Sequence, residues 1–553
     1  MDSYYDLGTY SRPVTTSSRE AQLWFDRGLL WCYGFNHEEA LRCFAKAAEF
    51  DPGCAIAYWG IAYAAGCNYN KPWEAFREDE LQQALANIRD AMGKALAHLD
   101  SASPVERAFI RALVHRYPSQ AAGPDVFSAW NDAYAGAMRG VYAAFPEDLD
   151  VSSLFAEALI NRTPWKLWDL ASGRSAEGAS TVEAVEVLEK ALRRVEEDGL
   201  EPHPGLLHMY IHTMEMSPHP ERALRAGNAL RDLVPDAGHL RHMPSHIDVL
   251  CGHYRDVLVY NQKAIAADRK FLAREGALNV YALYRTHDYH FAVYGAMFLG
   301  QYRAAMEAAQ ELIDTTPEAL LRIPSPPMAD FVEGYLPMKQ HVLVRFGKWH
   351  EIIAQELPRD RELYCSTTAM MLYAQAVAHS ALGHIAQAET ARAAFLEAKR
   401  RVPESRRVHN NTVRDLLAVA EEMLNGEIEY RRGNHEVAFA HLRRSVELDD
   451  SLPYDEPWGW MQPTRHALGA LLLEQGRVGE AEAIYRSDLG LDGKLSRACW
   501  HPDNVWSLHG LHECLSRRGE TLEAPLIKAR LDLAQARADV PVRASCLCRR
   551  QAA

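Results

Sequence analysis

The sequence predicts an all-α fold in which helical hairpins stack into a superhelix, the α-solenoid class. From residue 19 to about 535 the chain is rich in alanine, and apolar residues recur three and four positions apart, which is the spacing of amphipathic helices. Alternating Val, Ile and Thr, the pattern of strands, is nearly absent. Glycine turns followed by amphipathic helices recur along the chain. One such hairpin cannot bury its apolar face alone, so neighbouring hairpins must stack.

The first hairpin carries the most specific pattern. Its residues have the spacing of the tetratricopeptide repeat: Trp24, Gly28, Ala40, Phe44, Ala47 and Pro52. We expect the first two on one helix, the next three on a second helix capped by Asn36. Weaker copies begin near residues 252, 300, 346, 382, 432 and 475. The predicted fold is therefore a tetratricopeptide-like superhelix running continuously over 21–535, between an N-terminal extension (1–20) and a C-terminal tail (536–553).

Composition excludes several classes of protein. Of 553 residues, 48% are apolar and 24% are charged, which excludes a disordered chain. No apolar run approaches the roughly 18 residues of a membrane helix, and the first 20 residues lack the basic start and apolar core of a secretory signal. We therefore expect a cytoplasmic protein. A net charge of −14 without a basic stripe argues against nucleic acid or membrane partners.

The ten cysteines contain no CxxC pair. Without an export signal, we expect all of them to be free thiols in a reducing cytoplasm. Cys546 and Cys548 fall in the tail sequence CLCRRQAA, where we expect fraying.

Histidines are concentrated in the middle of the chain. Residues 203–290 hold ten of the 24 histidines, where composition alone would give about four. In HPGLLHMYIHTMEMSPHP, Pro204 suits the first turn of a helix and Pro218 its end. His208 and His212 are then one turn apart on one face, with Glu215 three residues further along. Such a pair can chelate one cation, and the carboxylate can be a ligand, an orienting partner or a base.

A second group, GHLRHMPSHIDVL, places His239, His242 and His246 within eight residues. We expect Gly238 to close the preceding helix and Pro244 to open the next one. His246 then lies in a first helical turn, His242 just before it, and His239 on the connecting turn.

The spacing between the groups suggests that they face one another. His212 and His246 are 34 residues apart, one repeat period, so we expect equivalent helices of consecutive hairpins to carry them. His290 lies 44 residues further on. The predicted metal ligands are His208, His212, His239, His242, His246 and His290. Imidazole-rich sites suit zinc or copper, with iron possible. Hydrogen bonding of these imidazoles to backbone and tyrosine is the alternative.

Other polar residues are candidates for a pocket. Besides Glu215, His37 and Glu38 at the turn of the first hairpin are candidate catalytic residues, although this turn can equally be a helix cap. The candidate substrate-binding residues lie in turns, beside prolines or, for Glu157 and Asn161, four positions apart on one helix. They are Asn68, Asn70, Glu157, Asn161, Trp165, Glu456, Trp460 and Arg465. Turn chemistry and packing between hairpins explain them as well.

The strings HPGLLHMYIH, GHLRHMPSHI and DEPWGWMQPTRHALGALL resemble a bacterial and fungal family of tetratricopeptide-repeat proteins, over about residues 21–515. The resemblance implies the fold and the histidine groups at 208, 212, 239, 242 and 246, and it supplies no reaction. Relatives tend to have Asn after the histidine at 287, where this chain has Asp288, so the resemblance assigns position 288 no role.

Two functions remain open from the sequence. The first is a metal-dependent enzyme that acts on a small molecule in the groove, with oxidative chemistry favoured over hydrolysis or a lyase reaction. No phosphate-binding loop, serine elbow, dinucleotide-binding fingerprint or HExxH string is present, which argues against the activities they mark. The second is a scaffold that binds peptide segments of partner proteins in its groove, with any metal purely structural.

Overall fold

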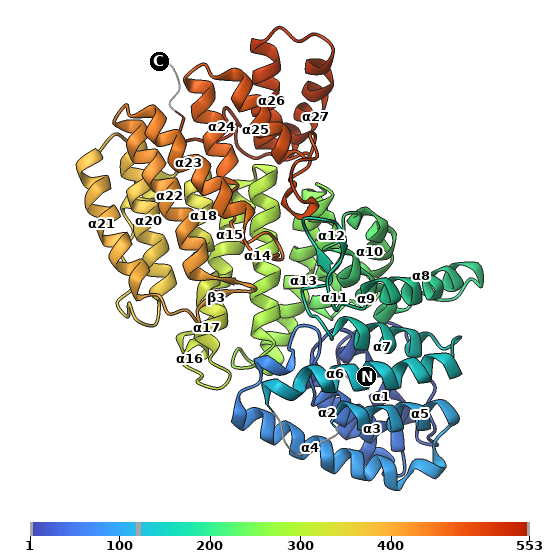
Figure 1. Ribbon diagram of the computed structural model, residues 1–553. Helices are drawn as coiled ribbons and strands as arrows, with labels where there is room; N and C mark the ends of the chain where they lie inside the picture. Colours follow the sequence, from blue (N-terminus) through green and yellow to red (C-terminus); the bar gives the residue numbers. More distant parts are fainter. Residues whose placement is uncertain (1–3, 118–122, 550–553) are drawn as a thin grey trace. The chain divides into compact units, whose positions relative to one another are not determined.

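The computed structural model describes residues 4–117 and 123–549. Its contacts divide the chain into two compact units, residues 1–247 with 263–274 and residues 248–262 with 275–553. Both are built from helices that follow one another in antiparallel pairs (Figure 1). The all-α fold of tetratricopeptide-like helical hairpins is therefore confirmed. No helix in the described ranges has both the length and the apolar character needed to cross a membrane.

The first unit contains the following elements: α1 (Arg19–Tyr33), α2 (His37–Phe50), α3 (Ala55–Ala64), η1 (Trp73–Ala75), α4 (Glu78–Ala97), η2 (Leu99–Ser101), α5 (Pro104–Leu113), η3 (Val114–Arg116), α6 (Pro124–Ala144), α7 (Leu149–Ile160), β1 (Trp168–Asp169), β2 (Arg174–Ser175), α8 (Thr181–Glu197), α9 (Pro204–Met214), η4 (Pro220–Ala223), α10 (Leu224–Leu230) and α11 (Gly238–His242). The two-residue strands pair antiparallel, Trp168 opposite Ser175. Helices α12 (Pro244–Leu250) and α13 (Tyr254–Glu275) contain residues of both units.

The second unit contains α14 (Ala282–Leu299), α15 (Tyr302–Asp314), α16 (Glu318–Leu321), α17 (Met328–Val332), η5 (Glu333–Tyr335), α18 (Met338–Arg345), α19 (Trp349–Ile353), α20 (Cys365–Ala381), α21 (Ile385–Arg401), β3 (Arg407–Val408), β4 (Asn411–Thr412), α22 (Val413–Arg431), α23 (His435–Asp450), α24 (Thr464–Glu474), α25 (Val478–Asp488), η6 (Arg497–Cys499), α26 (Val505–Arg517) and α27 (Glu523–Arg537). Strands β3 and β4 form the second antiparallel pair.

The first hairpin forms for the reason that its repeat pattern predicts. Asn36 caps α2 by accepting a hydrogen bond from the backbone N–H of Glu39. The buried Phe44 ring of α2 packs against Gly28 of α1 and Gly60 of α3. A Cβ atom at either glycine would lie 2.7 or 2.5 Å from that ring. Because glycine has no side chain, helices α1 and α3 can both pack closely against the Phe44 ring of α2.

Three local predictions were wrong. Gly238 does not close a helix but begins α11, which carries His239 and His242 in place of the expected connecting turn. Between α9 and α12 lie the short elements η4, α10 and α11, so the 34-residue spacing from His212 to His246 does not correspond to one regular hairpin. These helices are too short for the 3.6-residue periodicity of apolar residues to show where they begin and end.

The cysteine-containing tail also differs from its prediction. Eight cysteines are free thiols, but Cys546 and Cys548 form a disulfide. The chain around them is not frayed, since Ser545 and Cys548 are each 2% exposed. Buried side chains and backbone hydrogen bonds hold this segment, and composition alone did not reveal those partners.

Candidate metal centre

Helix α9 provides the first two imidazoles of the candidate site. His203 is its N-cap and accepts a hydrogen bond from the backbone N–H of Leu206, while Pro204 occupies the first helical position. The helix is buried on all sides, and His208 and His212 are both 0% exposed. Their rings lie one turn apart, with centroids 4.7 Å from each other. The sequence predicted this helix and the shared face of the two histidines correctly.

A third imidazole comes from α11. One ring nitrogen from each of His208, His212 and His239 lies within 4.8 Å of the other two. A zinc ion holds imidazole nitrogens at about 2.1 Å in a tetrahedral arrangement, so two nitrogens on one ion lie about 3.4 Å apart. Nitrogens within 4.8 Å of one another reach that separation by shifts of less than about 1 Å in each side chain. We call these three residues the histidine trio.

Hydrogen bonds fix the tautomers of two members of the trio. Nδ1 of His208 lies 2.5 Å from the carbonyl oxygen of Tyr33, and a carbonyl only accepts, so Nδ1 is the donor. Nδ1 of His212 lies 2.8 Å from Oε1 of Glu215 and donates to that carboxylate. In a neutral imidazole the other nitrogen then carries a lone pair. Both Nε2 atoms are therefore set up as metal ligands, as is usual where an outer acceptor holds the ligand ring.

Glu215 connects the trio to the other two predicted ligands of this segment. Its second oxygen accepts from Nδ1 of His246 at 2.5 Å, and Nε2 of His246 lies 2.7 Å from Nε2 of His242. These contacts form a row of hydrogen bonds that runs from His242 through His246 and Glu215 to His212. All four side chains are buried. Glu215 thus accepts hydrogen bonds from two imidazoles at once, and its catalytic role stays a prediction.

Burial keeps two members of the trio, His208 and His239, in the metal-binding protonation state. Desolvation holds the pKa of His208 well below its usual value, with a further contribution from nearby His212. Desolvation likewise holds the pKa of His239 well below its usual value, and the nearby histidines lower it further. A neutral imidazole is the form that binds metal, and a group of charged imidazoles in a dry site would repel one another.

Aromatic rings enclose the trio. The Phe35 ring lies 4.6 Å from that of His208 and stacks on those of His212 and His239 at 5.7 and 5.6 Å. The Tyr69 ring also packs against that of His212, at a centroid distance of 4.7 Å. Sequence patterns did not identify Phe35, Tyr69 or the Tyr33 carbonyl. Only the positive φ of Phe35 (56°) marks it as unusual, and that cannot be read from the sequence.

One of the predicted substrate-binding residues, Trp165, extends this environment, and two others, Glu157 and Asn161, precede it in the chain. The Trp165 ring packs against Tyr69 at 5.3 Å, and its backbone N–H donates to the Tyr69 hydroxyl. Glu157 in α7 is 5% exposed and accepts a hydrogen bond from Asn161 at 3.1 Å. Burial raises the pKa of Glu157 to about 8, so this carboxyl group is protonated at neutral pH.

The remaining candidates in the first unit belong to none of the possible metal-binding groups among residues 4–117 and 123–549. His37 begins α2, with Nδ1 2.9 Å from the carbonyl oxygen of Ala64, and burial lowers its pKa to about 3. Glu38 is exposed. The side chain of Asn68 accepts from the backbone N–H groups of Asn70 and Lys71, which is turn chemistry. Their catalytic and binding roles stay predictions.

Four candidates lie in the second unit. His290 is fully buried in α14, with Nε2 2.9 Å from the sulfur of Met461. Trp460 packs edge-on against His341, and Glu456 is 3% exposed. Arg465 forms a paired ion bridge with Asp450. Their roles as a metal ligand and in substrate binding also stay predictions.

Comparison with known proteins adds no family. No family model matches the chain, and no curated protein matches it. Among solved structures, the chain is similar to yeast Tom70 (11% identity, 93% of this chain and 99% of that chain, TM-score 0.28). It is also similar to Cut9 in the Cut9–Hcn1 complex of APC/C (14%, 94% and 88%, 0.28), and to human IFIT1 bound to m7Gppp-AAAA (13%, 94% and 91%, 0.29). At such values the likeness carries no argument about function.

Proposed function

We propose that this chain is a helical-repeat metalloprotein whose first unit binds one transition-metal ion through His208, His212 and His239. The observation that carries the proposal is the hydrogen bonding of the first two imidazoles. Both have Nδ1 committed to an outer acceptor, Tyr33 or Glu215, and so present Nε2 lone pairs within 4.8 Å of a third buried imidazole nitrogen. Three imidazoles with no thiolate suit zinc or copper, with iron possible.

We further propose that the ion serves a metal-dependent reaction on a small molecule. Glu157 supports this extension, because a buried carboxyl group with a pKa of about 8 is a proton donor suited to neutral pH. Its neighbour Asn161 is followed by Trp165, which packs on the same Tyr69 ring as His212. Oxidative chemistry is favoured over hydrolysis or a lyase reaction because the ligands are imidazoles. A cytoplasmic location and membership of the family with the HPGxxHxYIH and GHLxHMPSHI strings belong to the same proposal.

Elemental analysis tests metal binding directly. The protein is purified without an affinity tag and without reductant, then equilibrated with zinc or copper and freed of excess metal. We expect about one equivalent in the wild type, loss of that equivalent in His208→Gln, and retention in His341→Gln. The last variant is the matched control, because His341 is an equally buried histidine of the second unit. The proposal would be wrong if the folded wild-type protein retained neither zinc nor copper.

Turnover is tested on the same three proteins. Oxygen uptake by the metal-loaded wild type is measured over a panel of small molecules, with product mass spectra. Uptake that disappears in His208→Gln and persists in His341→Gln supports an oxidative enzyme. Metal binding without any uptake or new product would leave the ion with a structural role.

A second candidate function, a peptide-binding scaffold, is favoured by a different observation in the second unit. Two arginines donate hydrogen bonds to the backbone of one non-helical segment there. Arg345 donates to the carbonyl oxygen of Ser545 at 2.9 Å, and Arg431 donates to that of Cys548. The segment is the chain's own C-terminal tail. A partner protein would supply a similar non-helical segment, recognised through its backbone carbonyl groups.

Removal of the tail tests the scaffold. A variant that ends at residue 543 should bind a fluorescent peptide of residues 540–549, measured by anisotropy. Arg345→Ala in the same background should weaken binding by about tenfold, since one backbone hydrogen bond from a charged donor contributes about 1.5–3 kcal/mol. A shortened protein that folds but does not bind the peptide would argue against this function.

A further inference from the structure

The C-terminal tail is anchored at several points along the second unit. The hydroxyl of Ser545 donates to the carbonyl oxygen of His466 at 2.8 Å, and the Tyr485 hydroxyl lies 2.5 Å from the same Ser545 oxygen. Further along, the guanidinium of Arg549 forms an ion pair with Glu513. Cys546 and Cys548 lie between these anchors, so the fold fixes both sulfur atoms in place.

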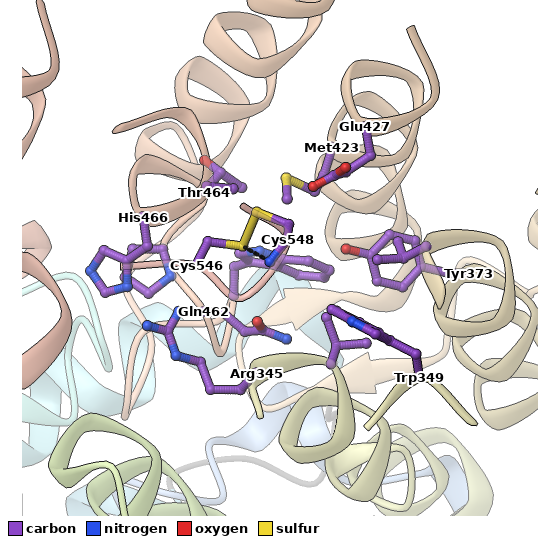
Figure 2. A pocket seen from close by; sticks show the side chains of 15 residues that line it. Arg345, Trp349, Tyr373, Met423, Glu427, Gln462, Thr464, His466, Cys546 and Cys548 are labelled. Atoms are coloured by element: carbon purple, nitrogen blue, oxygen red, sulfur yellow. Dashed lines mark hydrogen bonds between the residues drawn. A yellow bond between two sulfur atoms is a disulfide. The ribbon is translucent and has the colours of Figure 1, made fainter. Parts of the chain in front are cut away.

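The two sulfurs meet a buried carboxylate. Glu427 of α22 is 0% exposed, and one of its oxygens lies within 4.8 Å of the Sγ atoms of both cysteines. Figure 2 shows the two cysteines at the centre of a pocket, with Glu427 and Tyr373 among the side chains around them. The pocket has a cavity of about 20 Å³, enough for one water-sized particle.

The electrostatic environment suits a negatively charged set of ligands. Arg345 lines the same pocket (Figure 2) and is 5% exposed. Its Nε has no hydrogen-bond partner among the described residues, and burial lowers its pKa to about 9. Nε of Arg431 lies 3.8 Å from a Glu427 oxygen. Two buried cations beside the pocket would stabilise two thiolates and a carboxylate there, because a divalent ion bound to these three groups leaves one net negative charge.

We propose that the reduced form of this pocket is a second metal site, in which the thiolates of Cys546 and Cys548 and the carboxylate of Glu427 bind a zinc ion. Two sulfurs and one oxygen suit zinc, whereas calcium and magnesium need oxygen ligands only. Two sulfurs at about 2.3 Å from a tetrahedral ion lie about 3.8 Å apart. The Cα atoms of the two cysteines are 5.2 Å apart, which allows that separation by rotation of the side chains alone.

The two states of the pocket are linked by a balanced exchange. A dithiol reductant attacks the disulfide, so that the Cys546–Cys548 bond breaks and the reductant's own disulfide forms. Two electrons and two protons pass to the cysteine sulfurs. Zinc binding then displaces these two protons from the thiols. Reduction is the expected state wherever the other eight cysteines remain free thiols.

Cadmium provides a probe that separates this site from the histidine trio. The full-length protein is reduced with a dithiol, freed of it without oxygen, and titrated with Cd²⁺ alone while thiolate-to-metal absorption in the ultraviolet is recorded. Imidazole ligands give no such absorption. We expect the band to saturate at one equivalent in the wild type and in His208→Gln. The same band should be absent from protein that was never reduced.

Variants decide which residues bind. The double change Cys546→Ser with Cys548→Ser should abolish the band, whereas Cys251→Ser, at a partly exposed free cysteine of the same unit, should keep it. Glu427→Gln should weaken Cd²⁺ binding at least tenfold. Absence of the band in reduced wild type, or its persistence in the double variant, would overturn the site. Unchanged affinity in Glu427→Gln would remove the carboxylate from it.

Discussion

Each unit buries a cluster of histidines around a carboxylate, and the position of the carboxylate differs. In the second unit Asp488 lies at the centre. It accepts from His466 and His501, both at 2.9 Å, and also from Asn504 and Ser507. In the first unit Glu215 lies outside the trio, where one of its oxygens accepts from Nδ1 of His212 and the other accepts from Nδ1 of His246.

The difference separates a structural network from a candidate binding site. A carboxylate that accepts from four donors is already satisfied, and its imidazoles serve as hydrogen-bond donors to it. Histidines whose Nδ1 donates to Glu215 or to a carbonyl oxygen carry their lone pair on Nε2, the nitrogen that a metal ion would bind. To recognise a metal site, it is therefore more useful to know which ring nitrogen of each histidine forms a hydrogen bond within the protein than to count the buried histidines.

The largest effect should come from the centre of the second unit. Asp488→Asn replaces a buried charge with an amide that must turn an N–H group toward existing donors. We expect a loss of about 3–5 kcal/mol in the free energy of unfolding, measured by denaturant titration. The exposed Asp232→Asn, which removes a surface ion pair with Lys263, should cost less than about 1 kcal/mol. Similar small losses in both variants would show that Asp488 does not organise its cluster.

Metal should stabilise the first unit by a smaller amount. An ion present at about 100 times its dissociation constant adds about 2.7 kcal/mol to the free energy of unfolding. We expect this increment with zinc in the wild type and in His341→Gln, but not in His208→Gln. The protein is kept free of reductant during denaturant titration, so that the tail cysteines stay bonded. An equal increment in His208→Gln would place the ion elsewhere.

Removal of the orienting carboxylate should have a more modest effect. Glu215→Gln keeps the size of the side chain but loses the charge that holds Nδ1 of His212 and His246. Loss of such an outer partner typically lowers metal affinity about 10–100-fold, which competition with a chelator would measure. Glu189→Gln, at a partly exposed carboxylate of the same unit that pairs with Arg222, is the control. Affinity unchanged in Glu215→Gln would contradict the orienting role.

The sequence predicted the elements with strong local signals. Pro204 and the four-residue spacing identified α9 and the shared face of His208 and His212, because helix geometry alone determines both. It also grouped His239 with them, although it placed that residue on a turn. Tyr33, Phe35 and Tyr69 reach the trio through tertiary packing, for which a single sequence gives no signal. The same holds for the tail, where Arg345 and Arg431 overcome the tendency of a chain end to fray.

The smallest predicted effect concerns pH and again separates the two units. Burial lowers the pKa of His341 to about 3, against about 6.5 in the unfolded chain. Between these values only the unfolded state takes up the proton, so stability is complete above pH 6.5 and is lost as the pH falls. His341→Gln should therefore reduce the slope of unfolding free energy against pH by up to about 1.4 kcal/mol per unit between pH 6 and 5. Because His341 is not a proposed ligand, zinc should leave this difference between variant and wild type unchanged. A difference that vanishes with zinc would mean that the ion reaches the second unit's histidines, and the distinction between the two clusters would fail.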